Sequence, residues 1–167
     1  MTYAEKKKIM VEHPIKPVYD KNSRILILGS FPSVKSREAN FFYGHPQNRF
    51  WKVLAKVFED EVPVTVEEKR AFLLAHGVAV WDVIKSCDIV GSSDSSIKNV
   101  VANDLREILD AADIRKIFVN GKTAEQYYKK YIEKDIGRGA ICLPSTSPAN
   151  AAWNVEKLVA EWKRVAL

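Results

Sequence analysis

Two neighbouring segments hold the side chains best suited to chemistry. The first, residues 29–33, reads Gly-Ser-Phe-Pro-Ser, and the second, residues 43–51, reads Tyr-Gly-His-Pro-Gln-Asn-Arg-Phe-Trp. Four aliphatic residues, 25–28, lead into the first segment and end at its glycine. Hydroxyls, amides and flat rings at this density predict a long loop that lines a pocket, because such groups orient a planar ligand and stack on it.

Known catalytic motifs do not account for these segments. Gly121-Lys122-Thr123 resembles the end of a phosphate-binding P-loop, but Lys116 stands where that motif needs its first glycine. Residues 29–33 lack the central serine and the second glycine of a nucleophile elbow. The three histidines have no zinc-ligand spacing, and the two cysteines are too few to hold an iron–sulfur cluster. We therefore expect no metal and no other cofactor.

The composition predicts one folded domain that spans residues 1–167. The chain is 47% hydrophobic and carries a net charge of +5, which is typical of a globular protein with a substantial core. A moderately basic balance fits a polyanionic partner but does not require one. Residues 1–20 carry a short basic cluster and no apolar core, so we expect them to be loosely attached to the domain.

Nothing in the sequence directs the chain to a membrane. Residues 1–20 lack the apolar core of a signal peptide, and no apolar run reaches the roughly 18 residues of a membrane span. Cys87 and Cys142 lie far apart in the sequence, and buried free thiols are favoured over a disulfide between them. We therefore expect a cytoplasmic protein.

Apolar runs and helical spacing alternate along the chain. Continuous apolar runs predict four buried strands, at residues 24–28, 78–84, 116–119 and 140–143. Apolar residues at helical spacing predict five helices, at residues 48–58, 65–77, 103–112, 123–132 and 154–165. A capping box at Thr65 and Glu68 begins the second helix. This alternation predicts an α/β fold, a three-layer sandwich in which helices flank a four-stranded, mostly parallel sheet.

Each predicted strand ends in a polar loop. The four loops are residues 29–48, 82–99, 120–123 and 145–150. Ligands of open α/β sheets bind beyond the carboxyl ends of the strands. We therefore expect these loops to converge on one cleft.

Three segments taken together resemble the uracil-DNA glycosylase superfamily. They are residues 29–33, residues 45–51 and Ser145-Thr146-Ser147-Pro148. The nearest branch is the hypoxanthine-DNA (deoxyinosine) glycosylases, and the mismatch-specific uracil glycosylases share the second segment. The resemblance implies a four-stranded parallel sheet flanked by helices. It also implies metal-free hydrolysis of the N-glycosidic bond of a deaminated base in DNA, with hypoxanthine as the base expected for this branch.

The resemblance implies that Asn48 is the catalytic residue. Most of the superfamily has an Asp or Asn directly before the proline of the first motif, and this chain has Phe31 there. Phenylalanine can neither orient water nor act as a base. The hypoxanthine branch shares this change and is thought to rely on an asparagine that matches Asn48. Its amide could donate to the base carbonyl or position the water, while a purely structural N-cap is the alternative.

Five residues are expected to contact the extruded base: Phe31, Tyr43, Ser30, Phe42 and Asp82. Tyr43 matches the aromatic residue that stacks on the base in the superfamily, and such stacking offsets part of the cost of extrusion. Asp82 could face the cationic sugar, and backbone amides near Ser30 could support the leaving base. Core packing of the aromatic residues and a turn role for Asp82 are the alternatives.

DNA is the expected partner, held by loop hydroxyls and amides more than by a field of lysines. The expected DNA-contacting residues are Ser33, Lys35, Ser145, Ser147, Ala149 and Asn150, with Lys98 and Lys122 adding salt-dependent attraction. Ala149 stands where the superfamily has a leucine-like wedge, and Asn150 is a candidate substitute. Ser33 and Ser147 could instead cap helices or turns. A monomer suits an enzyme that must enclose a duplex.

Two other functions stay open on the sequence alone. One is a glycosylase that prefers uracil. The other is a nucleic-acid-binding module that kept the fold and lost catalysis, which the phenylalanine at position 31 would suit. Base release from duplexes that contain deoxyinosine or deoxyuridine separates these alternatives.

Overall fold

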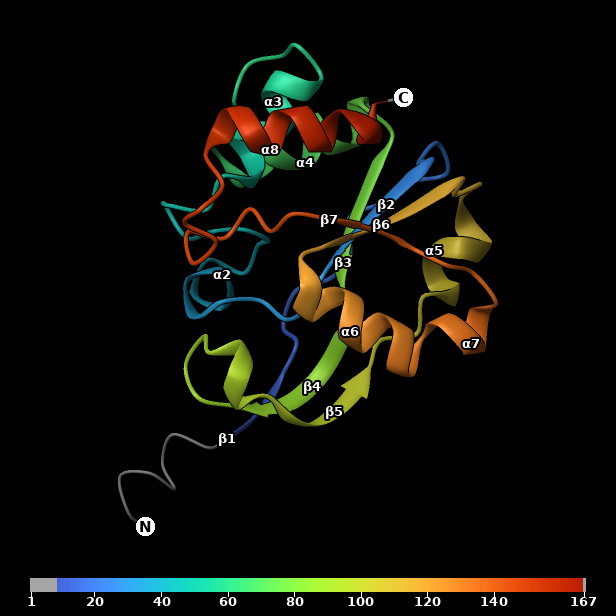
Figure 1. The fold of residues 1–167 in the computed structure, drawn as a ribbon. Coiled ribbons are helices and arrows are strands. Elements are labelled where there is room, and N and C mark those ends of the chain that lie inside the picture. The colour runs from blue at the N-terminus through green and yellow to red at the C-terminus, as the bar shows by residue number, and fades with distance from the viewer. Residues whose placement is uncertain (1–8, 167) are drawn as a thin grey trace.

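The computed structural model describes residues 9–166, which contain two β-sheets (Figure 1). The larger sheet is four-stranded and parallel, with the order β3-β2-β6-β7. Its strands are β2 (Ile25–Gly29), β3 (Val78–Asp82), β6 (Lys116–Asn120) and β7 (Ile141–Leu143). The predicted parallel sheet is therefore confirmed.

The strand order fixes the edge at which a ligand binds. The chain passes from β2 to β3 on one side of the sheet, and then to β6 and β7 on the other side. In doubly wound sheets the binding crevice lies where this order reverses, outside the carboxyl ends of the strands. The reversal falls between β2 and β6, whose last residues are Gly29 and Asn120.

Helices cover both faces of the larger sheet (Figure 1). The helices on one face are α3 (Phe50–Val57), α4 (Val66–Ala75) and α8 (Val155–Trp162), which runs into η2 (Lys163–Val165). The helices on the other face are α5 (Arg106–Ala111), α6 (Lys122–Tyr131) and α7 (Glu133–Ile136). Ile27 packs into the core beneath the first group, whereas Leu26 and Leu28 pack beneath the second. These layers form the predicted sandwich.

Local sequence signals explain where the helices begin. The Glu68 N–H donates to Thr65 Oγ1 (3.1 Å), and the Thr65 N–H donates to Glu68 Oε1 (3.4 Å), which confirms the capping box of α4. In α3, Phe50, Trp51 and Leu54 are buried because apolar residues recur on one side of the helix.

A second, antiparallel sheet with the order β1-β4-β5 was not predicted. Its strands are β1 (Ile9–Glu12), β4 (Ile84–Ile89) and β5 (Lys98–Ala102). The predicted strand 78–84 is wrong at its end, because β3 stops at Asp82 and the chain turns into β4. The predicted loop 82–99 is largely replaced by β4 and the short helix η1 (Asp94–Ser96). In β4 buried and exposed residues mix, and β5 is mostly exposed, so neither gives a continuous apolar run.

The polar segment after β2 contains a short helix as well. This helix, α2 (Val34–Ala39), begins at Ser33, whose side chain accepts a hydrogen bond from the Ser36 N–H (3.1 Å). Six residues are too few for a periodic apolar pattern, so only the serine cap marks this helix in the sequence.

Residues 9–20 are attached to both sheets, contrary to the expectation of a loose N-terminal segment. β1 pairs with β4, the His13 N–H donates to the Lys85 carbonyl (2.7 Å), and Val18 forms an antiparallel bridge with Val80 of β3. Residues 1–8 of that expected segment lie outside the described residues. The segment therefore joins the small sheet to the edge of the large one.

Both cysteines are free, in agreement with the favoured prediction. Cys87 is fully buried on β4, and burial raises the pKa of its thiol to about 11. A thiol with such a pKa stays protonated near neutral pH and reacts slowly. Cys87 therefore serves packing, whereas Cys142 is half-buried and lines the cavity described below.

Candidate active site

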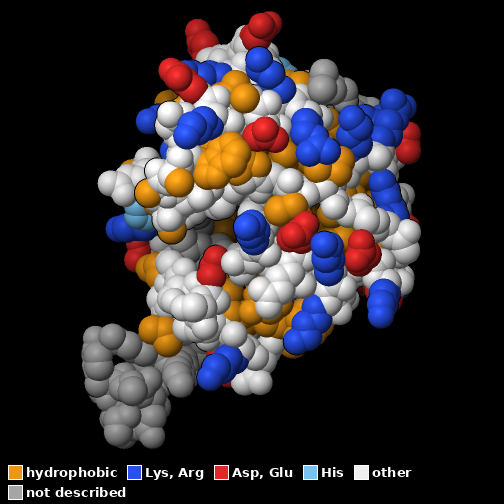
Figure 2. Space-filling view, viewed as in Figure 1, with side chains coloured by type: hydrophobic (Ala, Val, Ile, Leu, Met, Phe, Trp, Pro, Cys, Tyr) orange, Lys and Arg blue, Asp and Glu red, His pale blue; other side chains and the backbone are white. Residues whose placement is uncertain are grey.

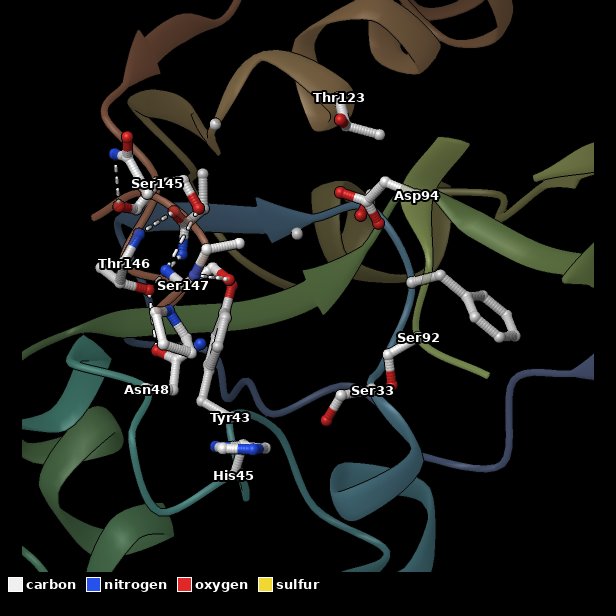
Figure 3. A pocket seen from close by; sticks show the side chains of 18 of the residues that line it. Ser33, Tyr43, His45, Asn48, Ser92, Asp94, Thr123, Ser145, Thr146 and Ser147 are labelled. Atoms are coloured by element: carbon white, nitrogen blue, oxygen red, sulfur yellow. Dashed lines mark hydrogen bonds between the residues drawn. The ribbon is translucent and has the colours of Figure 1, made fainter. Parts of the chain in front are cut away.

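A cavity of about 1090 Å³ opens at the carboxyl ends of the parallel strands. The four polar loops predicted to converge all contribute to its lining. Asn48, Thr146 and Ser147 gather on one side of the cavity, whereas Asp94 and Thr123 face one another across the other side (Figure 3). The predicted cleft is therefore present.

Asn48 lines the cavity with its side-chain oxygen fully engaged. Its Oδ1 accepts hydrogen bonds from the Phe50 backbone N–H (3.0 Å) and from the Thr146 hydroxyl (2.9 Å). The first bond forms a turn that leads into α3, but the N-cap of α3 is Arg49, so Asn48 is not the helix cap that the sequence left open as the alternative. The amide nitrogen makes no hydrogen bond to any of the residues that the structure describes. It is the polar group that Asn48 offers to a ligand.

Thr146 determines which way the Asn48 amide is turned. Thr146 is fully buried, and its Oγ1 accepts a hydrogen bond from Asn120 Nδ2 (3.0 Å) while its N–H donates to Asn120 Oδ1 (3.1 Å). The hydroxyl proton is therefore left for Asn48. Because the Phe50 N–H and this hydroxyl both donate, the atom facing them must be the Asn48 oxygen. The nitrogen is directed away from them, and the amide is fixed as a donor.

Tyr43 supplies an aromatic surface inside the cavity. Its ring stacks on Phe50, with 3.9 Å between ring centroids and 16° between planes. The Tyr43 backbone has φ of 50°, a left-handed conformation that is uncommon outside glycine. Trp51 supports it, because the indole N–H donates to the Tyr43 carbonyl (3.2 Å). With one ring face covered by Phe50, the other face is available to a flat base (Figure 3).

The Tyr43 hydroxyl is buried without a hydrogen bond of good geometry among the described residues. Burial raises the pKa of Tyr43 well above its ordinary value, the charge of Asp82 raises it further, and Asn120 acts weakly in the opposite direction. The hydroxyl is therefore neutral and able to donate to a group that enters the cavity.

Asp82 and His13 form a buried pair at the floor of the cavity. His13 Nε2 lies 2.7 Å from Asp82 Oδ2, and the two side chains are only 2% and 5% exposed. Asp82 stands opposite Gly29 in the register of the parallel sheet. A Cβ on Gly29 would lie 2.4 Å from Asp82 Oδ1 and 3.0 Å from the Tyr43 hydroxyl. Only glycine leaves room there for the carboxylate and the ring.

The other predicted base-binding residues, Phe42, Phe31 and Ser30, also line the cavity. Phe42 is almost fully buried and contacts the His13 ring (6.0 Å between centroids), which matches the core role left open for it. Phe31 is half-buried, edge-on to His13 (5.9 Å), with the Arg37 guanidinium 5.6 Å from its ring centre. The Ser30 carbonyl accepts a hydrogen bond from the start of β4 (3.0 Å). Contact of these residues with a base stays a prediction.

Ser33 and Lys35 lie on the α2 side of the cavity. Ser33 lines the cavity and caps α2, as the structural alternative anticipated. Lys35 is exposed and pairs with Glu38 (3.8 Å) one turn later. Neither arrangement prevents contact with a phosphate, so their role in DNA binding stays a prediction.

The loop after β7 is held by hydrogen bonds among its own residues. Ser145 Oγ accepts from the Ser147 N–H (3.1 Å), and Ser147 Oγ accepts from the Ala149 N–H (3.2 Å). Asn150 Nδ2 donates to the Ser145 carbonyl (3.0 Å), so its side chain folds back on the loop. Ala149 is exposed at the tip. A wedge role for Asn150 would require this bond to break.

Arg49 attaches this loop to the start of α3. Its guanidinium donates to four backbone carbonyls, those of Thr146 (3.3 Å), Ser147 (2.7 Å), Asn150 (3.2 Å) and Trp153. Its own N–H donates to the Thr146 carbonyl as well (3.1 Å). The segments that carry Asn48 and Thr146 are therefore tied together by one side chain.

Comparison with known proteins identifies the family. The profile of the Uracil DNA glycosylase superfamily matches residues 16–166. The chain belongs to the uracil DNA glycosylase superfamily. A Methanosarcina acetivorans protein named "Hypoxanthine DNA glycosylase" is 32% identical over 158 residues, which cover 93% of this chain and 98% of that protein. A Methanosarcina barkeri protein of the same name is 32% identical over 143 residues, covering 84% and 89%.

A solved structure supports the same assignment. The solution NMR structure of a candidate uracil DNA glycosylase from Methanosarcina acetivorans superposes with a TM-score of 0.78 at 28% identity. The match covers 95% of this chain and 100% of that one. The fold expected from the resemblance to the superfamily is thereby confirmed.

Sequence reasoning missed four residues that organise this superfamily site: His13, Arg49, Asn120 and Thr146. Arg49 and Thr146 lie inside segments that carry the resemblance, and Asn120 ends a predicted strand, so their positions gave a signal. His13 gave none, because its partner lies 69 residues away in the sequence.

The chemical groups around the superfamily cavity are chiefly amides, hydroxyls, carboxylates and aromatic rings. Within residues 9–166, no three His, Cys, Asp or Glu side chains are grouped so that they could hold a metal ion. No helix in the same range has the length and apolar character needed to cross a membrane. Lys and Arg side chains are scattered among acidic ones on the face drawn in Figure 2 rather than gathered into one patch.

Proposed function

We propose that this protein is a DNA glycosylase that hydrolyses the N-glycosidic bond of deoxyinosine and releases hypoxanthine for base-excision repair. The observation that carries the proposal is the Asn48 amide, whose nitrogen is left free at the cavity while its oxygen is held by Thr146 and the Phe50 N–H. The names of the two Methanosarcina relatives support hypoxanthine as the base. We expect the enzyme to act as a cytoplasmic monomer.

The cavity can hold a base only after the base has left the duplex. Extrusion costs a few kcal/mol in lost stacking and pairing. The free face of Tyr43 returns part of this, since stacking of a base on an aromatic ring contributes about 1–3 kcal/mol. Phe50 supports the opposite face of the ring, so the stacking surface is in place before DNA binds.

Asn48 acts on the leaving base. As the glycosidic bond breaks, negative charge grows on hypoxanthine, and the Asn48 N–H donates to its carbonyl oxygen. A donor fixed in advance stabilises this developing charge more than it stabilises the bound substrate, so it lowers the barrier. Adenine carries an amino group in place of that oxygen and cannot accept the same hydrogen bond. The geometry therefore favours the deaminated base over adenine.

Two substitutions at Asn48 separate its chemical role from its structural one. Asn48→Asp keeps an oxygen for the Phe50 N–H and the Thr146 hydroxyl but replaces the donor nitrogen by an acceptor. We expect both Asn48→Asp and Asn48→Ala to slow single-turnover release of hypoxanthine by about 10²–10³-fold. Asn48→Asp should leave the melting temperature within a few degrees of the parent.

The same assay contains the outcomes that would overturn the proposal. Asn48→Asp that releases hypoxanthine as fast as the parent would show that no donor is needed at position 48. A parent that binds deoxyinosine DNA and releases no base would favour the non-catalytic binding module. A panel of duplexes with hypoxanthine, uracil and undamaged bases tests the choice of base, and faster release of uracil would contradict hypoxanthine as the preferred one.

A further inference from the structure

The buried pair of Asp82 and His13 has no part in the role given to Asn48. Asp82 ends β3, lines the cavity and is held from behind by His13, which comes from the segment after β1. The Asp82 backbone is fixed as well, because Asn103 Nδ2 donates to its carbonyl (2.9 Å). Because both the side chain and the backbone of Asp82 are held in position at the cavity, its carboxylate is a candidate for a chemical role.

The hydrogen bonds define how His13 holds the carboxylate. The Ile15 N–H donates to His13 Nδ1 (3.2 Å), so the proton of the neutral ring is on Nε2. Nε2 then donates to Asp82 Oδ2 over 2.7 Å. This bond fixes the plane of the Asp82 carboxylate.

The second oxygen of Asp82 is directed to the reaction space. Oδ1 has no hydrogen-bond partner among the residues the structure describes, and it lies 2.4 Å from the point where a Gly29 side chain would begin. The Tyr43 hydroxyl, also without a partner of good geometry, lies 3.0 Å from the same point. Two unsatisfied polar groups thus converge above Gly29. A buried hydroxyl without a partner, such as that of Tyr43, is normally satisfied by a ligand or by water.

We propose that Asp82 is the general base of the hydrolysis and that His13 is its positioning residue. This inference rests on the proposed glycosylase function and names the group that activates the water. Phe31 cannot perform that task in the first motif, where most of the superfamily has an acidic or amide residue. Asp82 is paired with Gly29 in the sheet, so its carboxylate reaches the start of the same motif from the neighbouring strand.

The step balances with water as the only co-reactant. The C1′–N9 bond breaks and its electron pair leaves with hypoxanthine, whose growing negative charge is stabilised by the Asn48 N–H. The cationic sugar that forms faces the Asp82 carboxylate. The water oxygen then bonds to C1′ and passes one proton to Asp82 Oδ1. Hypoxanthine leaves as an anion and takes up one proton from solvent, while the proton on Asp82 passes to solvent and restores the carboxylate, so the products are an abasic site and neutral hypoxanthine.

Asp82→Asn tests the carboxylate directly. General base catalysis contributes about 10²–10⁴-fold, so we expect single-turnover release of hypoxanthine to fall by at least about 100-fold. Affinity for a deoxyinosine duplex should stay within about threefold of the parent. Asp88→Asn is the matched control, because Asp88 is a carboxylate of β4 bonded to Asn99 outside the cavity. We expect its rate to equal that of the parent.

A binding measurement tests the charge without any reaction. Duplexes are prepared with either a neutral tetrahydrofuran or a cationic pyrrolidine in place of the damaged nucleotide. The parent should bind the cationic duplex at least about tenfold more tightly, because the carboxylate faces the position of C1′. Asp82→Asn should lose most of this preference. A parent that binds both duplexes equally overturns the proposal even if Asp82→Asn fails to fold.

The role of His13 is tested through its effect on rate and affinity. We expect His13→Ala to lower kcat by about tenfold while KM changes little, because the carboxylate loses its orientation. His13→Gln, whose amide can donate to Oδ2, should recover part of the loss. Equal activity of Asp82→Asn and the parent, or equal losses in both His13 variants, would overturn the proposal. Failure of the proposed function itself is distinguishable, since the parent would then release no base.

Discussion

An asparagine can present either its oxygen or its nitrogen to a ligand, and at position 48 two neighbours decide between them. The Phe50 N–H and the Thr146 hydroxyl both donate, so they hold the oxygen and leave the nitrogen free. Asn120 already donates a hydrogen bond to the Thr146 oxygen, so the Thr146 hydroxyl proton is directed to Asn48. At the scale of single residues, we therefore expect catalysis to depend on a chain of three polar side chains, Asn48, Thr146 and Asn120.

Thr146→Val tests that chain. Valine keeps the shape of threonine but removes the hydroxyl, so the Asn48 oxygen loses one donor and the Asn120 amide loses its acceptor. We expect kcat for hypoxanthine release to fall about tenfold, which corresponds to about 1.4 kcal/mol. The free energy of unfolding should fall by about 1–3 kcal/mol, because a buried amide is left unsatisfied. Thr146→Ser retains the hydroxyl, and a loss as large as that of valine would contradict this account.

Asn48 could be predicted from the sequence, whereas its control by Thr146 could not. The His-Pro-Gln-Asn-Arg-Phe-Trp string is specific enough to mark Asn48. The hydrogen bond between them joins residues 98 positions apart and depends on the meeting of two loops. The same limit applies to Asp82, which was expected to face the sugar while its partner His13 gave no signal.

At the scale of elements, Arg49 connects the start of α3 to the loop after β7. Its guanidinium donates hydrogen bonds to four backbone carbonyls of that loop. Only arginine, with its planar set of five N–H donors, can do so. Gly121 shows how close the loop approaches β6, because a Cβ there would lie 3.0 Å from the Ser145 Cβ. The expected DNA-contacting loop is therefore positioned as one rigid piece.

Arg49→Lys tests this connection. Lysine keeps the charge but cannot bind four carbonyls at once, so we expect the free energy of unfolding to fall by about 1–3 kcal/mol. Affinity for a duplex with an abasic site should fall about tenfold, because the loop that contains Ser145 and Ser147 is no longer held in position. Arg70→Lys is the control, since Arg70 lies over the Phe41 ring (5.4 Å) away from this loop. Unchanged DNA affinity in Arg49→Lys would exclude a role of the loop in DNA binding.

The strands that could be predicted from the sequence are those with continuous apolar runs. β2, β3 and β6 are buried on both faces and therefore read as strands. β4 and β5 form a sheet with an exposed side, and their mixed residues resemble a polar loop. β1 was missed because it has only four residues, and its pairing with the distant β4 cannot be read from the sequence.

At the scale of the whole molecule, the net charge is +5, and on the face drawn in Figure 2 the Lys and Arg side chains are interspersed with acidic ones. Sequence alone indicated the sign of the charge but not its distribution, which depends on the fold. A scattered charge predicts moderate electrostatic attraction to DNA. We expect few phosphate contacts, supplemented by hydroxyls and backbone amides at the rim.

The salt dependence of DNA binding tests this view. We expect the slope of log Kobs against log salt concentration to be about −2 to −4, as for a protein that neutralises a few phosphates. Lys122 lines the cavity at the start of α6, and Lys122→Ala should reduce the magnitude of the slope by about 1 for damaged and normal duplexes alike. Lys129→Ala is the control, because Lys129 pairs with Glu125 on α6 (3.7 Å). A steep slope unaffected by Lys122→Ala would indicate a basic surface elsewhere.

The segment that joins the two sheets carries His13, and the superfamily match begins just after it, at residue 16. A shortened version of the protein that starts at that boundary would keep every recognisable motif and the whole parallel sheet. It would nevertheless lack His13, the imidazole that we propose orients the Asp82 carboxylate. We therefore expect a protein trimmed to the matched residues 16–166 to keep the superfamily fold and to release base more slowly than the protein that retains His13.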